Sequence, residues 1–431
     1  MKKILALLSV ILMIFACQEQ QQTTTNKFDS FDQFLSDEVQ AGRLVGAQGM
    51  VWHDGQLVYN KTYGLRDRES GDSMRGDELF FIQSMTKPIV SAALMTLYDE
   101  GRFQLDDPIS QYLPEFASSV VVNDPTIGSS SGTHPAPSAM TIRQLLSHTA
   151  GMTHGIAPIT YDKEIWDGIL RNPNNKTLAE RVTALSQKPL IFDPGHRWHY
   201  SFSPDLVGRL VEVLSGKDLS TFLQERIFTP LGMQNSGYNL SAEQQQRVMT
   251  VYAFGADSTL QRLENQPKSS GNTLYSGVNA LFTTAADYLS FAGMMLNRGE
   301  WKGKRILKPE TVDLMATDHT GSVKFKLDTI NQYTKRSVAI VADSLGALGL
   351  EPGYGFGLGF AIMQDPAKAD RTAATKGEYF WSGANSTHFL INPNKRLVAV
   401  FMTQVASVGT PNPYGFYFGN IMRSSIYKEF E

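Results

Sequence analysis

Strand-like segments occur at both ends of this chain, and a long, mostly helical middle separates them. Near the N-terminus, Ala47 to Trp52 and Leu57 to Tyr63 flank Asp54-Gly55, which favours a hairpin because glycine tolerates the positive φ of a tight turn. Near the C-terminus, Thr387 to Ile391 and Leu397 to Met402 flank a second turn. The pattern predicts an α/β (α+β) fold: one antiparallel sheet, flanked by helices, is built from both chain ends and interrupted by an inserted, mostly helical domain.

The helical segments and the chain length suggest two structural units. At 431 residues, the chain exceeds what one hydrophobic core usually serves. We assign residues 28–115 and 300–431 to an α/β domain and residues 116–299 to a helical domain with loop insertions. Helices are expected at Thr141 to Ser147, Ser203 to Leu214, Thr284 to Leu296 and Tyr414 to Tyr427. Ser203-Pro204 reads as an N-cap followed by the first helical position, and Gly216 as a C-cap.

The N-terminal residues resemble the export signal of a bacterial lipoprotein. Lys2 and Lys3 precede an apolar run from Ile4 to Ala16, which is too short for a membrane-spanning helix and ends at Cys17, the only cysteine. Residues 1–17 are expected to be a signal peptide with a lipobox, with Cys17 lipidated, and residues 18–27 a flexible tether. An ordinary signal peptide with an incidental cysteine is the alternative. The expected location is the cell envelope, as a periplasmic or outer-membrane lipoprotein bound to the membrane by its lipid.

Charge and histidine spacing exclude several classes of partner. The formal net charge is -3 and 19% of the residues are charged, as in ordinary globular proteins, so no nucleic-acid partner is expected. No metal or cofactor is expected, because His148 and His154 lack an H-E-x-x-H context and His196 with His199 offers no better spacing. His148 is expected to be a buried residue that positions its loop. Oligomeric state is not indicated.

Ser84-Met85-Thr86-Lys87 has the spacing of a nucleophile and its base at the start of an apolar helix expected to run to about Glu100. Residues three apart share a helix face, so the Lys87 amine can reach the Ser84 hydroxyl. Burial would lower the pKa of the lysine and let it act as a base. A capping serine beside a solvated lysine is the structural alternative.

Two downstream segments could complete such a site. Tyr200 precedes a helix, and a phenol near a lysine can shuttle protons; a packed core aromatic is the alternative. Trp381-Ser382-Gly383-Ala384 is expected at the start of an edge strand that offers a backbone N–H to an oxyanion hole, with a glycine at a bend as the alternative. By contrast, Gly128 to Gly132 matches G-x-S-x-G, but a loop follows it, so Ser130 is expected to be structural.

Several blocks together resemble the serine β-lactamase-related superfamily, in particular its class C-like branch of esterases, D-aminopeptidases, transesterases and β-lactamases. They are FIQSMTKPIVSAALMTLYDEGRFQLDDPISQYLPEF, TIRQLLSHTAGM, HRWHYSFSPDLVGRLVEVLSG, LFTTAADYLSFAGMMLNRGE, GYGFGLGF and FWSGANSTHFLINPNKRLVAVFMTQ. The resemblance runs from about Phe28 to the C-terminus. It implies Ser84 as nucleophile, Lys87 as base and Tyr200 as proton shuttle. It also implies backbone oxyanion donors at Ser84 and Ala384.

Two departures from the class C pattern bear on substrate choice. Tyr200-Ser201-Phe202 replaces Tyr-x-Asn, and Trp381-Ser382-Gly383 replaces a triplet that begins with lysine. Both changes favour a more apolar, less anionic substrate and an esterase more than a lactamase, so the expected partner is a small-molecule ester or amide. A peptidoglycan-directed D-aminopeptidase, carboxypeptidase or β-lactamase is an alternative, and an idle binding or sensor module that keeps the fold is another.

Overall fold

The fold is described from a computed structural model for residues 28–155, 159–170, 172–321, 353–368, 374–406 and 417–430. Its centre is an antiparallel sheet of eight strands in the order β12-β13-β14-β15-β16-β1-β2-β3. The long N-terminal strands are β1 (Gly46–His53) and β2 (Gln56–Asp67). The others are β3 (Asp72–Ser73), β12 (Tyr354–Phe356), β13 (Ala361–Met363), β14 (Tyr379–Gly383), β15 (Thr387–Asn392) and β16 (Leu397–Met402). The sheet is thus built from both chain ends, and the predicted fold class is confirmed.

The junction between the two chain ends lies inside the sheet. Strand β1 pairs with β16, with Met50 opposite Val400, and its other edge pairs with β2. Asp54 and Gly55 form the β1–β2 turn with φ values of 49° and 81°. Both values are positive, as a two-residue hairpin turn requires, so the predicted hairpin is confirmed.

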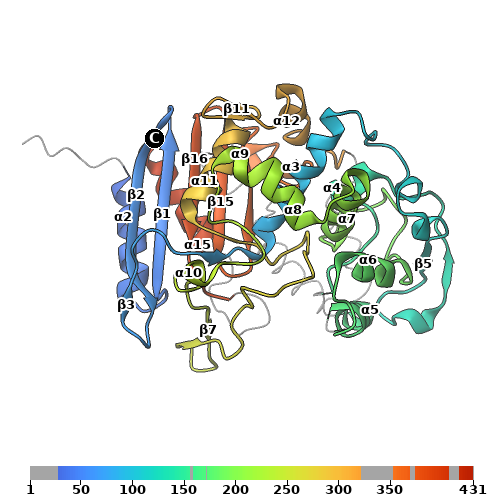
Figure 1. Cartoon of the computed structure of the whole chain (residues 1–431), viewed down its shortest axis with the longest axis horizontal. Coiled ribbons are helices and arrows are strands. Elements are labelled where there is room, and N and C mark those ends of the chain that lie inside the picture. Colours follow the sequence, from blue (N-terminus) through green and yellow to red (C-terminus); the bar gives the residue numbers. More distant parts are fainter. Residues whose placement is uncertain are drawn as a thin grey trace, which may run out of the picture.

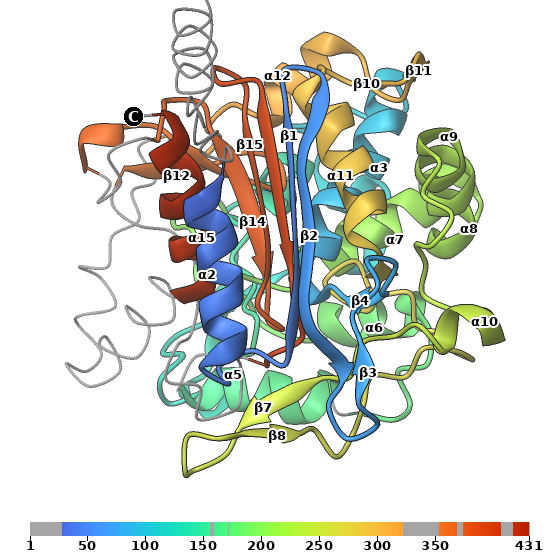
Figure 2. The same cartoon turned by 90° about the vertical axis from the view of Figure 1, so that its left-hand side faces the viewer.

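Helices cover both faces of the sheet. On one face lie α2 (Asp29–Gln40) and α15 (Tyr417–Tyr427); on the other lie α3 (Thr86–Asp99) and α11 (Ala285–Leu296), as Figures 1 and 2 show. Helix α11 packs against β1, β15 and β16. Helix α2 buries Phe31, Phe34 and Leu35, as its helical spacing predicts. The domain boundaries themselves stay a prediction.

The remaining helices lie mostly on the far side of α3 from the sheet (Figure 1). They are α4 (Ile142–Leu146), α5 (Thr160–Ile165), α6 (Leu178–Ser186), α7 (Ser203–Ser215), α8 (Leu219–Leu223), α9 (Thr229–Leu231), α10 (Ala242–Gln245) and α12 (Pro309–Met315). Helix α7 is central to this group, since it packs against α3, α4, α6 and α8. Gly216 ends it with φ 73°, as predicted. The predicted cap at its start is wrong: Phe202 is the N-cap, and the Ser203 hydroxyl bonds the Ser201 hydroxyl instead.

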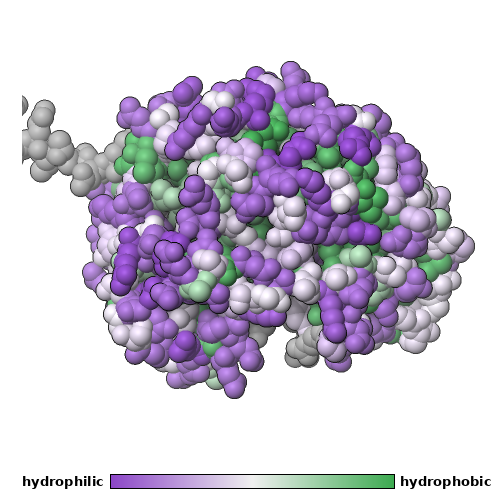
Figure 3. Space-filling model, in the orientation of Figure 1, coloured by the Kyte–Doolittle hydropathy of each residue, from purple (hydrophilic) through white to green (hydrophobic). Residues whose placement is uncertain are grey.

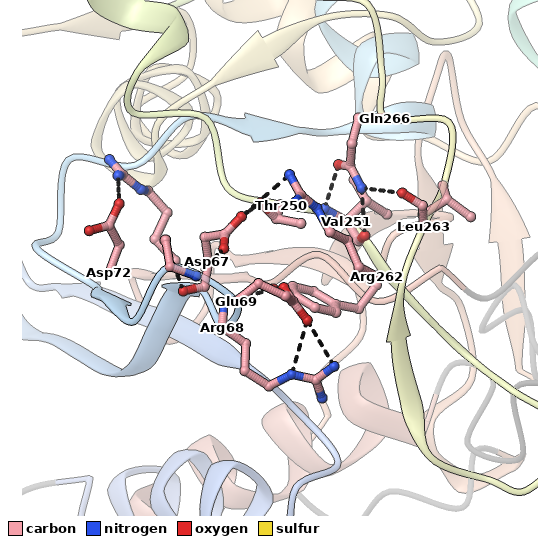
Figure 4. A network of polar contacts seen from close by, with 12 residues as sticks. Asp67, Arg68, Glu69, Asp72, Thr250, Val251, Arg262, Leu263 and Gln266 are labelled. Atoms are coloured by element: carbon pink, nitrogen blue, oxygen red, sulfur yellow. Dashed lines mark hydrogen bonds and ion pairs between the residues drawn. The ribbon is translucent and has the colours of Figure 1, made fainter.

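The short strands outside the main sheet pair two by two. They are β4 (Phe80–Phe81), β5 (Val120–Val122), β6 (Thr133–Pro135), β7 (Tyr252–Phe254), β8 (Leu260–Arg262), β9 (Phe282–Thr283), β10 (Glu300–Trp301) and β11 (Lys304–Arg305). Figure 4 shows how the β7–β8 hairpin is tied to the end of β2. Thr250 donates a hydrogen bond to Asp67 at 2.5 Å, and Tyr252 donates to Glu69 at 2.7 Å. These contacts fix the start of the segment that returns through β9 to pair with β4, just before Ser84.

Within the described ranges, none of the helices combines the length and the apolar character needed to cross a membrane. Cys17 and the tether lie outside the described residues.

Candidate active site

Ser84 lies on a tight turn between β4 and α3. The turn is a 3₁₀ helix over Gln83–Met85, so α3 begins two residues later than the predicted helix. Gln83 has φ 48°, a left-handed conformation that costs free energy for a residue with a β-carbon. The Met85 amide donates to the Ile82 carbonyl at 3.0 Å, and the Tyr288 hydroxyl donates to the Met85 carbonyl at 3.1 Å. The serine is partly exposed on a turn that its neighbours hold firmly.

Lys87 is buried beneath Ser84, with 1% of its surface exposed. Its Nζ donates to Ser84 Oγ at 2.9 Å and to the Val278 carbonyl at 3.0 Å. Burial holds the pKa of Lys87 well below its usual value, and the negative charge of Asp205 opposes that shift. An amine that gives up its proton this readily, at hydrogen-bond distance from a hydroxyl, is suited to act as its base.

Tyr200 lies against both residues. Its ring centroid is 4.6 Å from Lys87 Nζ and 5.4 Å from the ring of Trp381. Burial raises the pKa of Tyr200, whereas the nearby Ser84 and Trp381 side chains lower it in part. Neither side chain meets hydrogen-bond geometry with the phenol, whose oxygen has no partner among the described residues. The phenol is therefore protonated at neutral pH and able to donate its proton.

The segment Trp381-Ser382-Gly383 ends β14, whereas we predicted it at the start of an edge strand. Strand β14 is internal, but β13 pairs with it only at Tyr379 and Phe380. Its last residues instead contact the Ser84 turn. A β-carbon on Gly383 would lie 2.3 Å from the Ile82 carbonyl oxygen, so only glycine permits this approach. Ala384 follows Gly383 directly, and its role as a backbone oxyanion donor stays a prediction.

Several buried polar atoms around Ser84 have no hydrogen-bond partner among the described residues. They are Tyr200 Oη, Trp381 Nε1, Ser382 Oγ and both ring nitrogens of His154. Buried polar groups in folded proteins are nearly always paired. A cluster of exceptions beside one serine is typical of a site that receives a ligand or water.

The aromatic side chains of the site form one packed group. His154 stacks on Tyr200 and on Phe202, with centroids 4.7 Å apart in each case. Phe202 is thus separated from Ser84 by other rings and lies in the core. His148 is buried, has φ 58°, and bonds the Ser201 hydroxyl through Nδ1 at 2.9 Å. It holds the segment next to Tyr200 in place, as its predicted positioning role requires.

Asp205 is a site residue that the sequence analysis missed. It is fully buried in the first turn of α7. Its Oδ1 accepts hydrogen bonds from Ser276 Oγ at 2.7 Å and from the Gly277 and Val278 amides at 2.8 and 3.3 Å. Arg181 donates to its Oδ2 at 3.3 Å. Asp205 thereby fixes the loop whose Val278 carbonyl binds Lys87.

Ser130, the serine of the G-x-S-x-G match, lacks the surroundings that would make it a nucleophile. Ser130 is exposed in a 3₁₀ turn (Ser129–Ser131) that leads into β6 rather than into a helix. Its hydroxyl contacts only the Ile127 carbonyl, at 3.4 Å, among the described residues. The part of the chain that the structure describes also contains no group of three or more His, Cys, Asp or Glu side chains placed to hold a metal ion.

Known proteins share both the sequence pattern and the fold. A family model described as Beta-lactamase matches residues 31–418. Protein Rv1367c of Mycobacterium tuberculosis is 34% identical over 84% of this chain and 86% of its own length. Esterase EstB of Burkholderia gladioli is 30% identical over 89% of this chain and 91% of its own. The solved structure of EstCE1, described as a hydrolase with promiscuous acyltransferase activity, superposes with a TM-score of 0.74 at 22% identity, over 94% of this chain and 99% of that chain.

Proposed function

Because this chain belongs to the β-lactamase family, we propose that it is a serine hydrolase that cleaves carboxylic esters through an acyl-enzyme on Ser84. The main support for this proposal is the buried Lys87 amine, whose Nζ lies 2.9 Å from Ser84 Oγ. A relative that is 30% identical across most of both chains is named an esterase, which supports the choice of ester over amide or lactam.

The proposed reaction has two steps. Lys87 accepts the Ser84 proton as Oγ attacks the ester carbonyl, and the backbone N–H groups of Ser84 and Ala384 stabilise the resulting oxyanion. Tyr200 donates its proton to the departing alkoxide and is reprotonated from Lys87. In the second step, water attacks the acyl-enzyme carbonyl. Lys87 and Tyr200 take up its proton and return a proton to Ser84 Oγ as the carboxylic acid leaves.

The proposed preference for esters rests on two polar groups that the active site lacks. A β-lactam carries a carboxylate and an acylamino group, which need a cation and a polar amide as partners. Trp381, which packs on Tyr200, supplies no cation, and Phe202 is an apolar ring that lies in the core behind His154 and supplies no amide. Each buried polar group left unpaired costs roughly 1 to 3 kcal/mol, so two such losses correspond to about a hundredfold or more in relative kcat/KM.

The test compares kcat/KM for p-nitrophenyl butyrate and a chromogenic cephalosporin on one preparation. We expect the ester to be favoured by about two orders of magnitude or more. Ser84→Ala should abolish turnover and labelling by a fluorophosphonate probe, whereas Ser130→Ala, the matched serine control, should retain both. Preference for the cephalosporin would refute the ester assignment, and label on Ser130 would refute the nucleophile.

We also propose that the protein is lipid-anchored in the cell envelope. The support is the sequence pattern alone: a basic pair, a short apolar run and Cys17 directly after it.

A further inference from the structure

A cavity of about 260 Å³ lies where one end of the sheet meets two helices. Its wall is formed by the C-terminal end of α11, by α12, by the first residue of β14, and by the β1–β2 and β15–β16 turns. In Figures 1 and 2, α12 lies at the top of the molecule, at the same end as the β1–β2 turn. The volume far exceeds what one water molecule needs and is close to that of the smaller ligand sites in proteins.

Strand pairing places Tyr379 and Trp52 on two sides of this cavity. Tyr379 lies opposite Ile391, and Ile391 lies opposite Val398. Val398 in turn lies opposite Trp52. Residues that lie opposite each other in antiparallel strands point to the same face, so the four side chains form one row across β14, β15, β16 and β1. Three strand spacings of about 4.8 Å separate the two aromatic ends of the row by about 14 Å.

The inner wall of the cavity is apolar and its rim is polar. Met295 and Val312 are buried, and Ala316 is partly buried. Arg298 and Arg396 are exposed at the rim. Figure 3 shows a mostly hydrophilic surface over this end of the molecule, at the top of the view, with smaller hydrophobic areas between the polar residues. An apolar interior with a few polar groups is typical of a site for a small molecule.

The Tyr379 hydroxyl is a buried donor that lacks an acceptor. Tyr379 is 1% exposed, and its hydroxyl forms no hydrogen bond with a described residue. The ring is held by Phe360, with centroids 5.2 Å apart. Burial and the negative charge of Asp313, which also lines the cavity, raise the pKa of Tyr379, so the hydroxyl keeps its proton. Since buried hydroxyls are nearly always paired, this one marks a place for an acceptor.

The charged side chains of the rim are already paired. Arg298 donates to both carboxylate oxygens of Asp313, from Nε at 3.0 Å. Arg396 donates to Asp54 at 2.7 Å. Each pair is neutral as a whole, so an ion would have to displace a partner that is already bound. The Tyr379 hydroxyl and the indole N–H of Trp52 are both donors, so the lining favours an uncharged ligand that accepts hydrogen bonds.

We propose that this cavity binds an uncharged small molecule with an apolar body and a carbonyl oxygen that accepts a hydrogen bond from Tyr379. The proposal is independent of the Ser84 chemistry. Tyr379 and Gly383 are the first and last residues of β14, which places them about 13 Å apart. Because Gly383 approaches the Ser84 turn, the cavity is a separate site at the other end of the strand.

Binding of 4-fluoroacetophenone, followed by fluorine NMR, tests the proposal. This ketone has an aromatic body and a carbonyl group, and it contains no bond that a hydrolase cleaves. We expect a Kd on the order of 1 mM for a ligand of about ten heavy atoms. Tyr379→Phe should weaken binding about threefold to tenfold, which is the effect of one lost hydrogen bond. The same variant should bind 1-ethyl-4-fluorobenzene, which has no carbonyl, as well as the wild-type protein does.

Two further variants serve as controls. Tyr161→Phe removes another buried hydroxyl, which donates to the Pro189 carbonyl at 2.5 Å, and should leave the affinity unchanged. Ala316→Phe fills the cavity and should weaken binding of both ligands. Circular dichroism confirms the folding of each variant.

The outcomes separate this proposal from the proposed function. Equal affinity of the wild-type protein and Tyr379→Phe for the ketone, or no saturable binding by the wild-type protein, would overturn the proposed site. Competitive inhibition of p-nitrophenyl butyrate hydrolysis by the ketone, at a concentration equal to its Kd, would place the ligand at Ser84 and overturn it as well. Failure of the wild-type protein to hydrolyse the ester would overturn the proposed function alone, because binding of the ketone is measured without turnover.

Discussion

Replacing Asp205 and replacing Arg181 with neutral residues should shift the pH dependence of kcat/KM in opposite directions. Asp205 connects to Lys87 through Val278: the carboxylate accepts from the Val278 amide at 3.3 Å, and Lys87 donates to the Val278 carbonyl at 3.0 Å. The negative charge raises the pKa of Lys87 against the larger effect of burial. Asp205→Asn keeps an acceptor for the loop but removes that charge, so the pKa of Lys87 should fall further.

The magnitude follows from Coulomb's law. Two hydrogen bonds and the backbone of one residue put the two charges on the order of 7 Å apart, which at an effective dielectric constant of about 20 is worth about 2 kcal/mol, or one to two pKa units. Lys87 is the proposed base and must be neutral to act, so kcat/KM rises with pH through its pKa. In Asp205→Asn, this acidic limb should move down by about one to two pH units.

Arg181→Met is the discriminating variant. It removes a positive charge that lies 3.3 Å from Asp205, so the pKa of Lys87 should rise and the acidic limb should move up. Either variant leaves one buried charge unpaired, which costs roughly 3 to 5 kcal/mol of stability. Thermal unfolding curves of both variants therefore identify a temperature at which each is folded, and the assay is run there. The assay is kcat/KM for p-nitrophenyl butyrate from pH 4 to 10. Shifts of the same sign in both variants would refute the electrostatic reasoning.

Three further predictions concern single positions. Tyr200→Phe removes a hydroxyl and keeps the ring, so kcat/KM for an alkyl ester should fall about a hundredfold or more, and less for a p-nitrophenyl ester, whose leaving group needs no proton; equal losses for both would remove Tyr200 from the acid role. Gly383→Ala would place a methyl group 2.3 Å from the Ile82 carbonyl, so turnover should fall about tenfold or more without loss of folding by circular dichroism, and unchanged turnover would contradict the described approach of β14. Cys17→Ser should move the protein from the membrane fraction to the soluble fraction; a soluble wild-type protein whose mature N-terminus is not Cys17 would disprove the anchor.

The features that the sequence predicted well depend on neighbouring residues. The Asp54-Gly55 turn and the spacing of Ser84 and Lys87 each lie within a few positions, where turn chemistry and helical geometry act directly. One longer-range feature could also be predicted, namely that strands from both chain ends form one sheet, because such strands have few other ways to share a core.

The start of α7 was predicted wrongly for a local reason, since the Ser203 hydroxyl bonds Ser201, but the two larger errors depend on contacts distant in sequence. The position of Trp381 at the end of an internal strand follows from pairing with β13 and β15, which local pattern does not reveal. Asp205 receives its hydrogen bonds from Arg181 and from residues 276–278, and only the fold brings these together. An acidic residue at the start of an otherwise apolar helical segment was the one available signal, since a charge that becomes buried there requires partners.

Substrate preference in this protein is tied to the stability of its core. Trp381 is 1% exposed and packs against Tyr200 and Phe356, with centroids 5.4 and 5.3 Å away. A lysine at this position would place an unpaired charge among aromatic rings, at a cost of several kcal/mol, and would remove the packing that holds Tyr200 near Lys87. Trp381, which occupies the position where a β-lactam carboxylate would need a cation, therefore also positions Tyr200, the proposed proton donor. A change from ester to lactam specificity would require repacking around Tyr200, and a single charged substitution at the strand end would not achieve it.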